Sequence, residues 1–85
     1  MTLNESYKIV CEKILNGNET KHDMNSAILA LHESATKLWQ ATENEQSDKI
    51  KLRAANALIS VFHVMCELGI EDLESCLLEK INEAG

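Results

Sequence analysis

The 85-residue sequence has no proline, only three glycines, and a single residue each of tryptophan, tyrosine and phenylalanine. A β-sandwich or β-barrel needs turn residues about every ten positions, together with many β-branched and aromatic residues. Because the chain is poor in both, the composition excludes those folds and favours an all-α protein. Its length leaves room for one hydrophobic core. We therefore expect a single helical domain over residues 1–85.

Positive charge is scarce as well, since 8 Lys and Arg residues against 14 Asp and Glu residues give a net charge of −6. A nucleic-acid binder carries a basic face, so this balance argues against one. No apolar run reaches the roughly 18–20 residues of a membrane span, and no signal-peptide pattern is present, so we expect neither. Three cysteines fall at apolar helix positions, which is typical of reduced core residues in a cytoplasmic protein, with a disulfide between two of them as the alternative: Cys11, Cys66 and Cys76.

Apolar periodicity and helix start and stop signals predict four helices, over about residues 3–15, 22–42, 48–68 and 71–82. Capping signals precede the first three helices: Thr2 with Glu5, Thr20 with Asp23, and Ser47. Glu71 and Asp72 are expected in the first turn of the last helix, where the helix dipole favours anions. Because short connections force neighbouring helices to be antiparallel, the expected architecture is an up-and-down four-helix bundle.

Two stripes of residues characterise the central helices. In the second helix, one buried face is predicted from Met24, Ile28, Leu31, Ala35 and Leu38. The third helix is nearly all apolar from Ala54 to Leu68, so we expect it to be surrounded by protein. Its polar residues form one stripe that faces solvent or lines a cavity: Lys49, Arg53, Asn56, Ser60, His63 and Glu67. Three short neighbours are too few to cover this helix, so we expect self-association, most simply a homodimer.

The sequence resembles a known family over about residues 24–82. The segments LHESATKLWQA (Leu31–Ala41) and AANALISVFHVMCELGIEDLESCLLEK (Ala54–Lys80) are similar to MazG-like nucleotide pyrophosphohydrolases, the all-α NTP pyrophosphatase superfamily. The similar features are the apolar pattern, the turn Leu68-Gly69-Ile70 followed by acidic residues, and the interval between the two segments. The resemblance implies a four-helix MazG-like fold of antiparallel helices, completed by dimerisation.

The family's chemistry depends on four carboxylates, which hold Mg²⁺ so that a metal-activated water attacks the α-phosphorus and releases pyrophosphate. They come from a Glu-x-x-Glu and a Glu-x-x-Asp motif, whose spacing puts each pair on one side of a helix. The corresponding positions in this chain are Ser34 and Lys37, then Arg53 and Asn56. Only the adjacent Glu33 is acidic, so the resemblance predicts a degenerate member with no catalytic residues, no metal ligands and no cofactor.

The two cations, Lys37 and Arg53, take the place of metal ligands and suit a phosphate or a partner's carboxylate, arginine through its bidentate fork. The expected function is a non-catalytic binding module, regulatory or inhibitory, for a protein partner or a phosphate-bearing ligand such as a nucleotide. Glu33, Asn56 and His63 are further candidate binding residues. The simpler interpretation is a solvated or ion-paired surface for the cations, and a structural histidine in place of a general base oriented by Glu67.

Two alternatives of other classes remain open at this stage. The first is an active Mg²⁺-dependent nucleoside triphosphate pyrophosphohydrolase with a rearranged metal site, drawing on Glu33, Glu43, Glu45 or Asp48. The second is a subunit that completes its fold only beside a longer catalytic partner.

Overall fold

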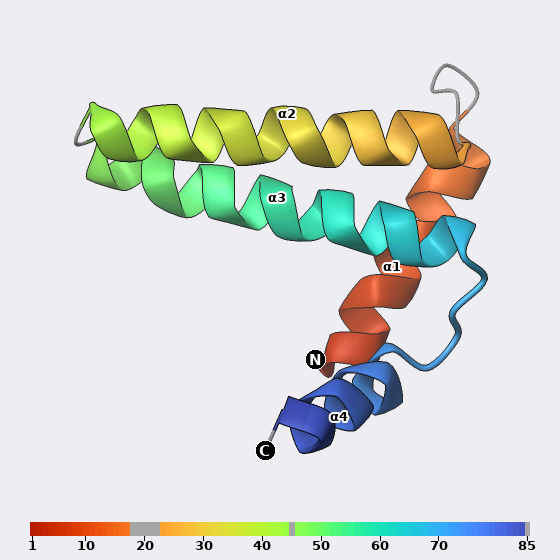
Figure 1. The fold of residues 1–85 in the computed structure, drawn as a ribbon. Helices are drawn as coiled ribbons and strands as arrows, with labels where there is room; N and C mark the ends of the chain where they lie inside the picture. Colours follow the sequence, from red (N-terminus) through yellow and green to blue (C-terminus); the bar gives the residue numbers. More distant parts are fainter. Residues whose placement is uncertain (18–22, 45, 85) are drawn as a thin grey trace.

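The computed structural model describes residues 1–17, 23–44 and 46–84, and within them the chain is helical without a strand. The four helices are α1 (Leu3–Asn16), α2 (Met24–Glu43), α3 (Ser47–Glu67) and α4 (Leu73–Ala84). Figure 1 shows α2 and α3 lying side by side as an antiparallel pair, called the α-hairpin below. The helix α1 crosses this pair near one end, and α4 lies next to the N-terminal end of α1. The all-α prediction and its four helices are confirmed.

The capping residues explain where the helices begin. The Thr2 hydroxyl accepts a hydrogen bond from the Glu5 backbone N–H at 3.1 Å, as the sequence predicted. Asp23, which was predicted to act together with a cap at Thr20, is itself the N-cap of α2, because its carboxylate accepts a hydrogen bond from the Ser26 backbone N–H at 2.8 Å. The predicted cap by Ser47 is wrong, because Ser47 is already the first residue of α3 and Gln46 precedes it without a side-chain cap. The predicted contribution of Thr20 lies outside the described residues.

The start of α4 also differs from the prediction. The Asp72 carboxylate accepts hydrogen bonds from the Ser75 backbone N–H at 3.1 Å and from the Ser75 hydroxyl at 2.7 Å. Asp72 therefore caps the helix from outside, and the helix starts at Leu73 and not at residue 71. These hydrogen bonds from Ser75, with another from Asn4, lower the pKa of Asp72 below its ordinary value.

Contact within the α-hairpin follows a seam of residues that alternate in steps of three and four, as in a coiled coil. On α2 the less exposed residues are Met24, Ala27, Leu31, Ser34, Leu38 and Ala41, and on α3 they include Ile50, Arg53, Ala57, Ser60, Val64 and Glu67. The predicted face of α2 is wrong at two positions, because Ile28 is 48% exposed and Ala35 is also exposed. Beside Ile28 the small Ala27 lies in the seam, since a small residue lets the two helix backbones approach closely, and beside Ala35 the polar Ser34 lies in the seam.

The main apolar cluster lies where α1, α3 and α4 meet. Tyr7, Phe62 and Leu73 are buried there, and the rings of Tyr7 and Phe62 pack edge to face with centroids 5.5 Å apart. The Tyr7 hydroxyl donates a hydrogen bond to the Ile70 carbonyl, which holds the α3–α4 connection over α1. The Asn4 side chain joins the start of α1 to α4, because its Oδ1 accepts from the Glu74 backbone N–H at 3.0 Å.

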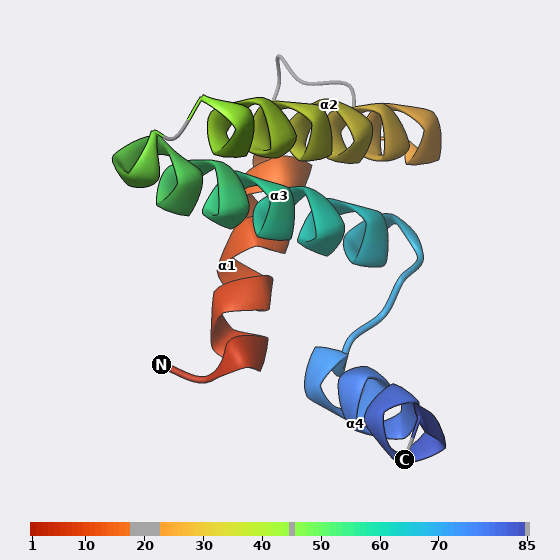
Figure 2. The ribbon, with the colours of Figure 1, turned by 60° about the vertical axis from the view of Figure 1, so that its left-hand side comes forward.

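The expected up-and-down bundle applies to the α-hairpin only. Figures 1 and 2 show α1 crossing the α-hairpin steeply, and the hairpin extends past α1 and α4 toward its turn. The radius of gyration, 14.0 Å, exceeds the value of about 12 Å for a compact chain of this length. The expectation that α3 is surrounded by protein is wrong for the single chain, since Leu58 is 50% exposed and Ile59 is 47% exposed. The reason is that α2 covers one face of α3, whereas α1 packs only against its C-terminal half.

Candidate functional site

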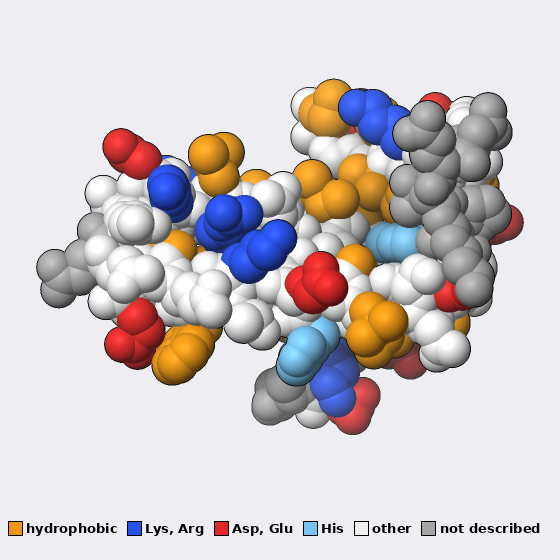
Figure 3. Space-filling model, turned by 90° about the horizontal axis from the view of Figure 1, so that it is seen from above, with side chains coloured by type: hydrophobic (Ala, Val, Ile, Leu, Met, Phe, Trp, Pro, Cys, Tyr) orange, Lys and Arg blue, Asp and Glu red, His pale blue; other side chains and the backbone are white. Residues whose placement is uncertain are grey.

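A pocket of about 210 Å³ opens between α2 and α3. Its lining contains all four positions that the family resemblance singled out, together with two neighbours on α3: Ser34, Lys37, Arg53, Asn56, Ile59 and Ser60. Each helix brings its pair to the same side because residues three apart lie next to each other on a helix surface. Figure 3, a view from above, shows Lys and Arg side chains gathered over the part of the molecule toward the hairpin turn.

The floor of this pocket is a hydrogen-bonded pair of serines. The Ser34 and Ser60 hydroxyl oxygens are 2.8 Å apart across the helix seam, and Ser60 is buried. The Ser60 hydroxyl also donates to the Asn56 carbonyl at 3.1 Å. Because a hydroxyl has only one proton, Ser34 is then the donor to Ser60. Both hydroxyl protons are used within the protein, so the donors left for a ligand are Lys37, Arg53 and the Asn56 side-chain amide.

The two cations of the pocket have no acidic partner within the part of the chain that the structure describes. Arg53 is half-buried and Lys37 is exposed. Glu33 is exposed one helical turn before Lys37, yet it does not line the pocket and forms no ion pair with Lys37 or Arg53. The pocket therefore holds uncompensated positive charge in a protein of net charge −6. That arrangement favours an anion over a metal ion.

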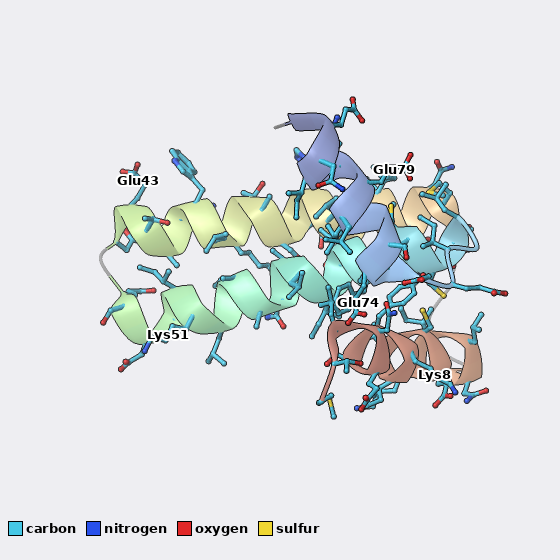
Figure 4. The ribbon with its side chains drawn as sticks, turned by 90° about the horizontal axis from the view of Figure 1, so that it is seen from below. Lys8, Glu43, Lys51, Glu74 and Glu79 are labelled. Atoms are coloured by element: carbon cyan, nitrogen blue, oxygen red, sulfur yellow. The ribbon has the colours of Figure 1, made fainter. Side chains whose placement is uncertain are left out.

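Of the carboxylates that a rearranged metal site would draw on, those that the structure describes do not line this pocket. Glu43 and Asp48 are exposed beside the hairpin turn, and Glu45 lies outside the described residues. Figure 4 shows Glu43 at the end of α2, where its side chain points away from the helix pair. Among the described residues, no group of three or more His, Cys, Asp or Glu side chains is arranged to hold a metal ion.

His63 lies on the predicted polar stripe but outside the pocket lining. It is buried, and its Nε2 lies 3.3 Å from Glu67 Oε1 on the next turn of α3. Ser60, one turn earlier, bonds to Ser34 and not to His63. The predicted stripe is therefore divided into an N-terminal part that borders the pocket and a C-terminal part that is packed inside the protein.

A second and larger pocket, about 650 Å³, was not predicted from the sequence. It lies between α1 and the α3–α4 connection, and both Cys11 and Cys66 line it. Tyr7 borders the same space, and burial raises the pKa of its hydroxyl above its ordinary value of 10.0. The only sequence signal was that both cysteines fall on apolar helix faces.

Within the described residues, none of the helices is both long enough and apolar enough to cross a membrane. Comparison with known proteins finds no family model, no curated protein and no solved structure that matches the chain.

Proposed function

We propose that the chain is a non-catalytic, MazG-like helical module that binds a phosphate-bearing ligand in the pocket between α2 and α3. One observation carries the proposal: Ser34, Lys37, Arg53 and Asn56, the positions at which the family holds its metal, line one pocket. Two of them are cations, and no carboxylate lines the pocket with them. In place of a metal that bridges to phosphate, the protein would then supply the positive charge itself.

The donor set suits phosphate for physical reasons. A guanidinium group can give two parallel N–H bonds to one phosphate, and the lysine ammonium and the Asn56 amide supply further donors. Arg53 is half-buried, so its attraction to an anion is screened less by water than that of a fully exposed group. Ile59 on the pocket wall is an apolar surface for the adjoining part of the ligand. The pocket volume suits a phosphate or pyrophosphate group with the rest of the ligand outside it.

Homodimerisation is the second part of the proposal. On the side of the α-hairpin opposite the pocket, helical geometry brings together exposed residues without charge, called the apolar flank: Ile28, Ala35, Trp39, Ala54 and Leu58. Trp39 is 63% exposed there. A second copy is the favoured occupant because these five residues carry no charge and the neighbouring Lys51, one turn before Ala54, is a cation, so two flanks meet without the repulsion that the acidic remainder would cause. The extended shape of the single chain supports the same conclusion.

Isothermal titration calorimetry with inorganic phosphate and pyrophosphate tests the binding proposal. Hydrogen bonds to charged groups contribute about 1.5–3 kcal/mol, so Arg53→Ala and Lys37→Ala should each weaken binding roughly 10- to 100-fold. Lys51→Ala is the matched control, because Lys51 is an exposed cation on α3 that does not line the pocket (Figure 4). It should change the affinity less than twofold. If all three variants lost the same affinity, the overall charge of the protein would explain the binding, and the proposed site would be contradicted.

A further inference from the structure

The larger pocket brings together two cysteines from different helices. Cys11 is on α1 and Cys66 is in the last turn of α3, and both line the space of about 650 Å³ beside the α3–α4 connection. That volume lies within the range of about 300–1,000 Å³ typical of small-molecule sites. Tyr7, Lys8 and Ile70 also border it. The space is therefore large enough for a small thiol-bearing molecule to reach both sulfur atoms.

The two thiols are neighbours and not merely occupants of one pocket. Both pack against the same buried cluster of Tyr7, Phe62 and Leu73. The third cysteine, Cys76, is on α4 and does not line this pocket. All three are free thiols in this structure.

We propose that Cys11 and Cys66 form a thiol–disulfide exchange site, which reacts with a low-molecular-weight disulfide such as oxidised glutathione and closes a reversible covalent bond between α1 and α3. The site is separate from the phosphate pocket, which lies between α2 and α3 and contains no cysteine. It makes the attachment of α1 to the α-hairpin dependent on the thiol–disulfide balance of the surroundings.

The exchange proceeds in two balanced steps. Cys11 loses its proton to water and its thiolate attacks one sulfur of the small disulfide, so that a mixed disulfide forms and one small thiolate leaves and takes up a proton. Cys66 then loses its proton and attacks the Cys11 sulfur, which forms the protein disulfide and expels the second small thiol. Two protein thiols are oxidised and one small disulfide is reduced to two thiols. Cys11 is the first to react because burial raises the pKa of the Cys66 thiol to about 11, which leaves little Cys66 thiolate at neutral pH.

Folding favours this disulfide over the same bond in the unfolded chain. The cysteines enclose about 55 residues, and closing a loop of that length in an unfolded chain carries an entropy cost that corresponds to roughly a thousandfold in the equilibrium constant. In the folded protein the two thiols already lie together, so that cost is avoided. The ratio of reduced glutathione squared to oxidised glutathione at which half of the protein is oxidised should therefore be roughly a thousandfold higher for the folded protein than for the chain in urea.

The test is equilibration of the full chain, folded or in urea, with glutathione redox buffers, followed by acid quenching, intact mass and peptide mapping. Folded protein should lose two hydrogens and give a single cross-linked peptide pair containing Cys11 and Cys66. Cys76→Ser, the matched control, should behave identically, whereas Cys66→Ser should stop at a glutathione adduct on Cys11. A folded protein that forms only adducts, that cross-links through Cys76, or that oxidises within tenfold of the unfolded chain overturns the proposal. The wild-type mapping decides the matter even if a variant fails to fold.

Discussion

The attachment of α4 depends on one buried side chain, Leu73, and this leads to a quantitative prediction. Leu73 is 2% exposed in the cluster with Tyr7 and Phe62, and hydrogen bonds between Asn4 and Glu74 also join α1 to α4. Truncating a buried leucine to alanine costs about 2–5 kcal/mol, through lost burial and the cavity that remains. A domain of this size has a total stability of about 4–13 kcal/mol. We therefore expect Leu73→Ala to remove about 3 kcal/mol, a large share of the whole.

Thermal unfolding followed by circular dichroism measures this effect. At about 4–8 °C per kcal/mol for a small domain, the Tm should fall by about 12–24 °C. The matched control is Leu78→Ala on the same helix, where the side chain is 57% exposed and the expected change is within about 0.5 kcal/mol. In hydrogen exchange, the amides of α4 should lose protection before those of α2 and α3. A Leu73→Ala variant as stable as Leu78→Ala would refute the assignment of Leu73 as the anchor of α4.

Four further outcomes are expected. Tyr7→Phe should cost about 1 kcal/mol by removing the hydrogen bond to the Ile70 carbonyl. Burial raises the pKa of Tyr7 above 10.0, so the wild-type protein should lose stability as the pH rises past 10, where the unfolded tyrosine ionises and the folded one keeps its proton. Denaturant titrations at increasing pH should show a smaller loss of stability in Tyr7→Phe than in the wild type. Parallel stability curves for the two proteins would contradict this. The fluorescence emission of the single tryptophan, Trp39, should shift to shorter wavelength as the protein concentration rises and dimers bury the apolar flank. An unchanged spectrum, together with the mass of a single chain by light scattering at every concentration, would count against dimerisation. With Mg²⁺, a variant carrying Ser34→Glu, Lys37→Glu, Arg53→Glu and Asn56→Asp should release pyrophosphate from nucleoside triphosphates while the natural chain does not; a folded variant without turnover would argue against MazG-like ancestry.

The helices were predictable because their signals are local. The apolar periodicity and the cap at Thr2 act within a few residues, and they place α1 and the approximate extent of α2 without knowledge of the rest of the chain. The start of α4 was misplaced because Asp72 serves equally well, in sequence, as a first-turn acidic residue or as a cap. The side-chain bonds to Ser75 decide between the two roles.

Long-range geometry was predicted less well. The i, i+3 spacing placed Ser34 with Lys37 and Arg53 with Asn56, but the direct bond between Ser34 and Ser60 depends on the register of two helices, which no local signal contains. The buried face of α2 was misassigned at Ile28 for a similar reason. Large apolar residues dominate a sequence pattern, whereas close packing of two helices selects small ones. The meeting of Cys11 and Cys66 depends on α1 crossing α3, so the sequence offered only three cysteines that could pair in several ways.

An anion site between α2 and α3 is tested most directly by a titration of isotope-labelled protein with inorganic pyrophosphate, followed by two-dimensional NMR. We expect saturable shifts of the Asn56 side-chain amide and the Arg53 Nε–H signal, together with backbone amides around Ser34 and Lys37. The Asn4 side-chain amide, which borders the other pocket, is the internal control and should stay in place. Signals that remain unmoved around Arg53 and Asn56, or that move only around Asn4, would contradict an anion site between α2 and α3.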